Sequence, residues 1–255
     1  MSFWKAGIGG MIGFTIGGPI GGMIGFTLGG PIGGILGAII GSKLSDDERR
    51  PSNNQKNQAA FFTALFACFA KIAKADGRVS REEIDKVDQF IKERFNFPSD
   101  QRAFAIQIFN HAKDDRNSFE AYAHQLASLL ASSPSSLVMF YELLFELSMA
   151  DGHLDKAEEA LLLSAIEIFN IDPNLFETNK KKFGANLNDA YSILGVDESM
   201  PFNEIKKTYQ RKRKEFHPDT LISKGLPDEL LDKAKEKFIE IQAAFEEIEK
   251  KNKLN

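Results

Sequence analysis

The sequence of 255 residues contains a single cysteine, Cys68, so no disulfide can form within the chain. A reducing compartment is the simplest environment for such a chain. Cys68 lies in an apolar stretch with helical spacing that begins at Phe61, and no base is paired with it in the sequence, so we expect a core thiol rather than a nucleophile. The sequence also lacks a phosphate-binding loop and a dinucleotide fingerprint. We therefore expect neither enzymatic activity nor a cofactor.

Charged residues are absent from one long segment, residues 6–42. Glycine recurs there at every fourth position from Gly9 to Gly41, within a repeat that reads GGMIGFTIGGPI and then GGMIGFTLGGPI. The Gly-x-x-x-Gly pattern is typical of helices that pack closely in lipid, whereas so much glycine opposes helix formation in water. We therefore predict a membrane anchor over residues 1–44, through which two copies of the chain could form a homodimer.

The length and flanking charges of this segment bear on its topology. Residues 6–42 would extend about 55 Å as one helix, against roughly 30 Å of hydrocarbon. This favours either one central span with interfacial flanks or a helical hairpin broken near Pro19 or Pro31. Before the segment the chain has one basic residue, Lys5, and shortly after it there are three, Lys43, Arg49 and Arg50. This excess of positive charge favours a cytoplasmic location for the carboxyl side of the segment. The alternative without a membrane is a glycine-rich soluble tail that self-associates.

A polar stretch, residues 45–58, is predicted to be a linker to an all-helical domain over residues 59–180. Stretches such as FFTALFACFAKIAK and LVMFYELLFELSMA have helical spacing and enough Phe and Leu to close a core of their own. The motif ADGRV at residues 75–79 recurs as ADGHL at residues 150–154. In both copies the glycine, Gly77 or Gly152, is predicted to end a helix in the left-handed conformation. The predicted fold class is all-α.

Each copy of this motif carries a glutamate seven residues after its aspartate, and two interpretations remain open. In the first, Ser80 with Glu83 and Asp155 with Glu158 form capping boxes for the helices that follow. In the second, four carboxylates converge on a divalent cation through oxygen ligands. The candidate metal ligands are Asp76, Glu83, Asp151 and Glu158. Capping already accounts for carboxylates at these positions.

The segment at residues 187–255, after a short linker at residues 181–186, has two apolar helical stripes that flank the tripeptide His217-Pro218-Asp219. Two such helices can pack as an antiparallel hairpin and present the tripeptide at its tip. Lys212 is the one charged member of either stripe. The stripes consist of Ile205, Tyr209, Lys212 and Phe216 upstream and of Ala234, Phe238, Ile241 and Phe245 downstream.

The helix before the tripeptide is strongly basic, with six lysines and arginines between residues 206 and 214 and only Glu204 and Glu215 beside them. Exposed charge of one sign acts mainly on the rate and the orientation with which a partner associates. Nucleic acid is not expected, because acidic residues offset the basic ones elsewhere in this segment and the whole chain has a net charge of −4 and a pI near 5.7.

These residues carry a family resemblance. The stretch from Leu187 to about Lys251 resembles the J domain of DnaJ-like co-chaperones in its motifs AYSILGV, IKKTYQRKRKEFHPD and KFIEIQAAFEEI. The loop LISKGLPDELLDKAKEKF is similar to that of the membrane-anchored DjlA-type members. The central region resembles the TerB-like fold, which in those proteins lies between the anchor and the J domain.

The resemblance implies a membrane-tethered co-chaperone that stimulates ATP hydrolysis by a DnaK-type chaperone at the cytoplasmic face of the bacterial inner membrane. Three residues depart from the family pattern: Lys212 replaces a core Leu, while Gln210 and Thr220 replace basic residues. An alternative function is a metal-responsive envelope-stress scaffold that acts through the TerB-like domain and carries a degenerate J domain. The residues implied to contact the chaperone are Lys206, Lys207, Gln210, Arg211, His217, Pro218 and Asp219.

Overall fold

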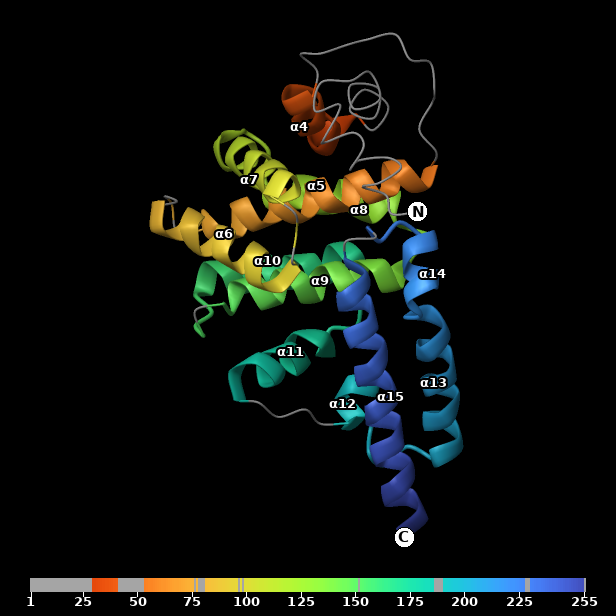
Figure 1. Cartoon of the computed structure of the whole chain (residues 1–255). Helices are drawn as coiled ribbons and strands as arrows, with labels where there is room; N and C mark the ends of the chain where they lie inside the picture. The colour runs from red at the N-terminus through yellow and green to blue at the C-terminus, as the bar shows by residue number, and fades with distance from the viewer. Residues whose placement is uncertain are drawn as a thin grey trace.

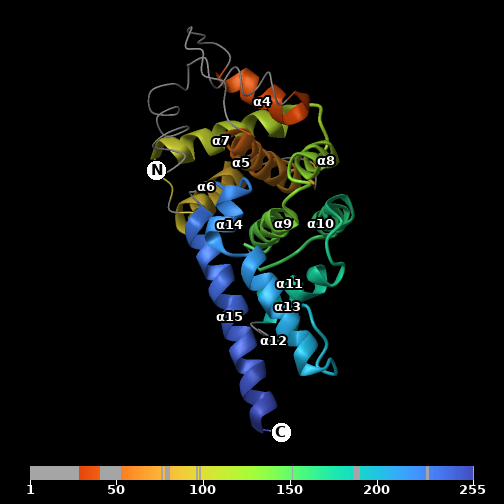
Figure 2. The same ribbon diagram turned by 90° about the vertical axis from the view of Figure 1, so that its right-hand side faces the viewer.

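The structure, a computed structural model, describes residues 29–40, 53–75, 77, 81–95, 97, 99–150, 152–185, 190–227 and 230–254. Every regular element in these residues is a helix, which confirms the all-α prediction. Figure 1 shows a layered helical bundle beside a long helical hairpin, and the carboxyl end of the hairpin points away from the first described helix, α4. Figure 2, turned by 90°, shows the same separation between α4 and the carboxyl terminus.

The helices fall into two groups along the chain. The bundle contains α4 (Gly30–Ile40), α5 (Asn53–Ala73), α6 (Arg81–Phe95), α7 (Ser99–Asp114), α8 (Phe119–Leu129), α9 (Pro134–Ser148), α10 (Lys156–Phe169) and α11 (Asn174–Ala185). The carboxyl-terminal part contains α12 (Ala190–Leu194), α13 (Phe202–Glu215), α14 (Pro218–Ser223) and α15 (Leu231–Leu254).

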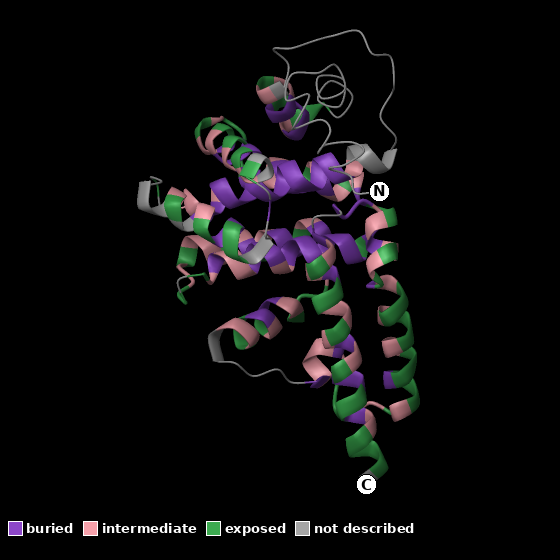
Figure 3. Cartoon of the chain, viewed as in Figure 1, coloured by how far each residue is buried: buried purple, intermediate pink, exposed green. Residues whose placement is uncertain are grey.

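The helix α5 is the centre of the bundle. Every residue from Gln58 to Ala70 is buried, and Figure 3 shows the middle of this helix in the colour of buried residues. A helix that is buried all round must be covered on every side by other elements. Phe61, for example, packs edge-to-face on Phe140 of α9 with ring centroids 5.3 Å apart. Cys68 is fully buried and this burial raises the pKa of its thiol, so the prediction of a core thiol is confirmed.

Two helices extend into segments whose polar residues predict linkers. α5 begins at Asn53, within residues 45–58, and α11 continues to Ala185, within residues 181–186. Both extensions have a packing partner: Gln58 is buried, and Phe183 stacks on Phe145 of α9 with ring centroids 5.9 Å apart. Tertiary contacts therefore continue these helices past the point where their polar residues suggest an end.

The two glycines of the repeated motif end helices as predicted. Gly77 has φ of 123° and Gly152 has φ of 81°, a region that favours glycine. Their N–H groups donate to the carbonyls of Lys74 and Met149, both at 2.9 Å. Asp155 then starts α10, where it forms the predicted capping box with Glu158.

The hairpin of α13 and α15 packs through the predicted apolar stripes. Ile205 and Ile241 are buried, and Tyr209 stacks on Phe245 with ring centroids 4.0 Å apart. The short helix α12 ends at Gly195, whose φ of 60° supplies the left-handed turn before α13. This arrangement confirms the antiparallel hairpin.

Candidate functional site

The tripeptide His217-Pro218-Asp219 forms the bend between α13 and α14. His217 is the amino-terminal cap of α14, and its Nδ1 accepts a hydrogen bond from the N–H of Asp219 at 3.3 Å. Pro218 follows in the first turn, where its ring restricts φ to a helical value. The buried side chains of Phe216 before the bend and Leu221 after it attach both flanks to the core. The bend therefore has little freedom to change its backbone conformation.

Both polar side chains of the bend face solvent. The side chain of His217 is 47% exposed and that of Asp219 is 89% exposed. The imidazole is oriented by an edge-to-face contact with Phe238 of α15, with ring centroids 5.3 Å apart. The structure thus holds the histidine ring in one place while leaving it within reach of a second protein.

The basic face of α13 lies beside this bend. Lys206, Lys207, Gln210 and Arg211 are all exposed, whereas Ile205 on the opposite side is buried against α15. Lys207 pairs with Glu204 at 2.8 Å and Arg211 pairs with Glu215 at 3.3 Å. Exposed pairs of this kind contribute only about 0–1 kcal/mol, so a partner can easily replace them. The predicted binding residues of α13 therefore lie on one side of the hairpin, and those of the tripeptide lie in the bend at the end of the same helix.

Lys212, the charged residue in the apolar stripe, reaches the carboxyl end of α12. Its ammonium donates to the carbonyl of Ile193 at 3.3 Å and lies beside Gly195, where the absence of a side chain leaves room. Burial lowers the pKa of Lys212 to about 8, and the positive charge of nearby Lys237 adds to this effect. The hairpin therefore accommodates a lysine here by giving its ammonium a backbone acceptor.

We expect Lys212 to make the stability of this protein depend on alkaline pH. The folded-state pKa of about 8 lies below the ordinary value of 10.5, so between these values the unfolded state binds more protons. The free energy of unfolding should therefore rise with pH across this window. Below pH 8 it is lowered by the full cost of burying the charged ammonium of Lys212. Lys212→Met should remove that rise and stabilise the protein at pH 7 by about 2 kcal/mol.

Urea unfolding at several pH values between 7 and 10.5 would measure this effect, with exposed Lys206→Met as the matched control. The control should keep the wild-type pH dependence. If Lys212→Met and the wild type had parallel pH profiles, the ammonium of Lys212 would not be buried in solution.

The amino-terminal half of α15 docks on α9 of the bundle through ion pairs that are largely shielded from water. Lys237 lies 2.6 Å from Glu142, and Lys233 lies 3.3 Å from Glu146, with all four side chains 12–15% exposed. Burial alone would lower the pKa of Lys237, but Glu142 and Glu240 together hold that pKa above its ordinary value. No motif in the sequence predicts these pairs.

The loop after α14 is attached to the bundle as well. The side-chain amide of Gln58 donates to the carbonyl of Leu226 at 3.1 Å, and this bond is buried. Gly225 has φ of 113°, and a Cβ there would lie 2.7 Å from the Cβ of Asn57 on α5. Because the chain after the bend is held this closely, the orientation of the tripeptide is fixed relative to the bundle.

The described residues do not assemble the predicted metal site. Asp76, Asp151 and the side chain of Glu83 lie outside the described residues, so their convergence stays a prediction. Glu158 accepts a hydrogen bond from the N–H of Asp155 at 3.1 Å, which is its role in the capping box. Within the described ranges, no group of three or more His, Cys, Asp or Glu side chains could hold a metal ion.

The predicted membrane anchor falls mainly on residues 1–28 and 41–44, which lie outside the described residues. A helix with the length and apolarity of a membrane span does not occur in the part of the chain that the structure describes.

An exposed His-Pro-Asp bend between a basic helix and its antiparallel partner defines a J domain. The DnaJ domain family model matches residues 189–254, and the family model of the tellurite resistance protein TerB matches residues 62–181. The chain belongs to the DjlA family of co-chaperones, in agreement with the resemblance seen in the sequence. It is therefore a J-domain co-chaperone, and the comparisons do not favour a metal-responsive scaffold.

The similarity to DjlA proteins extends over nearly the whole chain. Co-chaperone protein DjlA of Coxiella burnetii is 33% identical over 95% of this chain and 96% of its own length. The DjlA protein of Photobacterium profundum is 31% identical over 97% of this chain and 98% of its own length. The DjlA protein of Photorhabdus laumondii is 30% identical over 78% and 82%, respectively. No solved structure matches the chain significantly.

Proposed function

We propose that this co-chaperone stimulates ATP hydrolysis by a DnaK-type chaperone through the bend at residues 217–219 and the basic face of α13. The observation that carries the proposal is the exposure of His217 and Asp219 on a bend whose two flanks are buried. Such a rigid, exposed pair can form hydrogen bonds with a partner without first losing conformational freedom. The residues that perform hydrolysis belong to the chaperone, so the proposed activity is regulatory rather than enzymatic.

The cations of α13 have a separate role in this proposal. Lys206, Lys207 and Arg211 lie on an exposed helix, where charge acts mainly on the rate and orientation of association. Gln210 provides a hydrogen-bonding side chain on the same face without a charge. The basic face would therefore guide an acidic surface of the chaperone toward the bend.

The uncharged segment at residues 6–42 supports a second part of the proposal, a tether in the bacterial inner membrane. The TerB-like and J domains would then face the cytoplasm, where a DnaK-type chaperone and its ATP are available, and would direct that chaperone to clients at the membrane. The repeated Gly-x-x-x-Gly pattern supports a homodimer formed within the lipid.

A steady-state ATPase assay would test the proposed activity, with a purified DnaK-type chaperone and increasing amounts of the full chain in detergent micelles. We expect stimulation, and we expect its half-saturating concentration to rise with salt because the cations of α13 are exposed. Combining Lys206→Gln with Lys207→Gln should raise the half-saturating concentration and leave the maximal turnover nearly unchanged.

The matched control combines Lys251→Gln with Lys253→Gln, two exposed lysines at the far end of α15. This variant should behave as the wild type. Absence of stimulation would contradict the proposed function, while equal effects of the two double variants would show that the basic face of α13 has no special role.

A further inference from the structure

The helix that carries the tripeptide, α14, is too short to be stable by itself. It has only six residues, whereas isolated helices shorter than about 12 residues are marginal in water. Its amino end is capped from within the J domain by the side chain of His217. The position of the tripeptide therefore depends on what holds the other end of this helix.

The carboxyl end of α14 is closed by a Schellman motif. The N–H of Leu226 donates to the carbonyl of Leu221 at 2.9 Å, and both leucines are fully buried. The N–H of Gly225 donates to the carbonyl of Ile222 at 3.1 Å, and Gly225 has the positive φ that this motif requires. The N–H of Leu221 donates in turn to the carbonyl of His217 at 3.0 Å. Backbone hydrogen bonds thus connect the motif to the tripeptide.

The bundle holds this motif from outside the J domain. Near the start of α5, the side-chain amide of Gln58 donates to the carbonyl of Leu226 at 3.1 Å in a buried bond. Asn57 lies directly against Gly225, because a Cβ added to this glycine would be 2.7 Å from the Cβ of Asn57. The same added Cβ would be 3.3 Å from Leu130, which follows α8. Two parts of the bundle therefore enclose the residue that ends α14.

The hydrogen bond from Gln58 is strong enough to affect the order of α14. When a buried carbonyl loses a donor, the equilibrium constant for the conformation that buries it falls by about tenfold. A six-residue helix has little stability of its own to offset such a loss. The conformation of the tripeptide should therefore depend on the bundle.

We propose that the bundle is the positioning element of the J domain: Gln58 and Asn57 hold the carboxyl end of α14, and through this short helix they keep the tripeptide in the orientation that stimulates the chaperone. The inference rests on the proposed function. It gives the TerB-like domain a direct part in stimulation, in which Gln58 is a positioning residue that acts through α14.

Positioning predicts a particular effect on the kinetics of stimulation. The basic face of α13 can bind the chaperone whether or not the tripeptide is ordered, whereas stimulation requires the tripeptide in place. A less ordered tripeptide should therefore lower the maximal turnover and leave the half-saturating concentration nearly unchanged. Partial unfolding has the reverse effect, because it lowers the concentration of active co-chaperone and so raises the half-saturating concentration.

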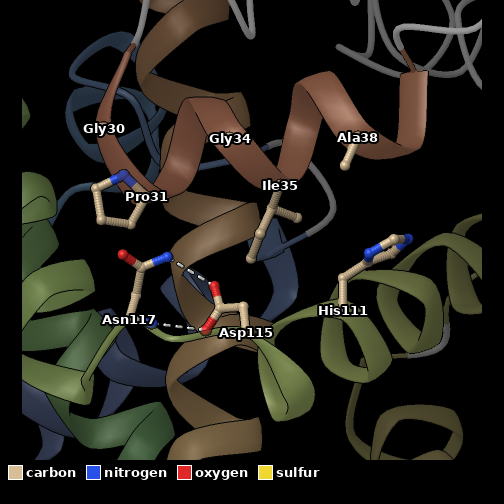
Figure 4. Close-up of a pocket in the computed structure, with 8 residues that line it drawn as sticks. All are labelled: Gly30, Pro31, Gly34, Ile35, Ala38, His111, Asp115 and Asn117. Atoms are coloured by element: carbon tan, nitrogen blue, oxygen red, sulfur yellow. Dashed lines mark hydrogen bonds between the residues drawn. The ribbon is translucent and has the colours of Figure 1, made fainter.

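A second glutamine of the bundle provides a matched control. The side-chain amide of Gln125 on α8 donates to the carbonyl of Gly29 at 2.7 Å, and it thereby holds the start of α4. Figure 4 shows the cavity of about 400 Å³ beside this point, with Pro31 of α4 on one side and Asn117 on the other. The residues that line the cavity come from α4, α7 and the chain that follows α7. A change at Gln125 should therefore loosen α4 and leave α14 in place.

The ATPase assay of the full chain in detergent micelles would test the inference with Gln58→Met, which keeps the length of the side chain and removes its donor. We expect the maximal stimulated turnover to fall by about threefold or more and the half-saturating concentration to change by less than about twofold. The control Gln125→Met should keep the maximal turnover of the wild type. Hydrogen exchange at the N–H groups of Leu221 and Leu226 should be faster in Gln58→Met and unchanged in Gln125→Met.

A double-mutant cycle across the domain boundary provides a second test that leaves Gln58 intact. Gly225→Ala places a methyl group against Asn57 and should also lower the maximal turnover. Adding Asn57→Gly should restore part of that turnover, because it removes the atom that the methyl group meets. Gly195→Ala is the control, since Gly195 also has a positive φ, of 60°, but its nearest neighbour is the flexible ammonium of Lys212. This control should keep the maximal turnover of the wild type.

The outcomes separate the inference from the proposed function. A wild-type chain that fails to stimulate the chaperone would refute the proposed function and the inference together. Unchanged kinetics in Gln58→Met, or an effect of Gly225→Ala that Asn57→Gly does not relieve, would refute the positioning role while the proposed function stands. A raised half-saturating concentration with unchanged maximal turnover in Gln58→Met would mean that this residue stabilises the fold only, which also refutes the inference.

Discussion

Replacing His217 with glutamine is expected to abolish the stimulation of a DnaK-type ATPase by this co-chaperone. The imidazole is exposed, and its contacts within the chain are the capping bond to Asp219 and the edge contact with Phe238. Glutamine can keep a polar group near the bend, but it cannot reproduce a planar ring that packs edge-to-face on Phe238. Hydrogen bonds to charged groups are worth about 1.5–3 kcal/mol, so the loss of one such bond between His217 and the chaperone should reduce stimulation at least tenfold.

Folding should survive this substitution, because His217 is exposed and surface changes usually alter stability by less than about 0.5 kcal/mol. The wild type and His217→Gln should therefore have the same thermal unfolding midpoint and differ only in the ATPase assay. His124→Gln, which changes another exposed histidine on α8, should retain full stimulation. Stimulation that persisted in His217→Gln would place the effective contact elsewhere on the J domain.

The parts of this fold that the sequence predicts are those set by neighbouring residues. The spacing of Ile205 and Tyr209 predicts the buried face of α13, and Asp155 three residues before Glu158 predicts the capping box of α10. In each case the residues that form the pattern lie within one or two helical turns of each other. A local pattern is sufficient to identify them.

The docking of the J domain on the bundle could not be predicted in this way. Lys237 and Glu142 are 95 positions apart, and each lies on a helix face whose charges are typical of a solvated surface. The one available signal is weak. Lys233 and Lys237 are four positions apart, as are Glu142 and Glu146, so the two lysines of one helix can lie opposite the two glutamates of another. Only the packing of α15 on α9 shows that these charges are paired and shielded from water.

The sequence of the uncharged amino-terminal segment also hides the start of α4, for a related reason. Its apolar character continues unbroken through Gly29, and the Gly-Gly-Pro sequence at residues 29–31 also occurs at residues 17–19. Nothing local distinguishes the two copies. The distinction comes from Gln125, which is 96 positions from Gly29 and bonds to this copy.

Glu142→Ala is expected to release the J domain from the bundle. The change leaves the ammonium of Lys237, 13% exposed, without its nearest carboxylate, although Glu240 remains 3.3 Å away. Removing one partner of a shielded pair typically costs 3–5 kcal/mol, and the remaining contact with Glu240 places this variant near the lower limit, about 3 kcal/mol. Because the α13–α15 hairpin has its own apolar core, the expected result is separation of the two domains rather than loss of either fold.

Hydrogen exchange would locate the effect, with faster exchange in the first half of α15 and in α9 and unchanged exchange in the second half of α15. Glu247→Ala is the matched control, since it breaks a pair with Lys251 in which both side chains are more than half exposed, and it should cost less than about 1 kcal/mol. Adding Lys237→Met to Glu142→Ala should restore part of the lost stability, because an apolar pair needs no counter-charge. Equal effects of Glu142→Ala and Glu247→Ala would mean that the ion pairs between α9 and α15 are open to water. The orientation of the His-Pro-Asp bend would then be set by other contacts, such as those of the loop at Gly225 with α5.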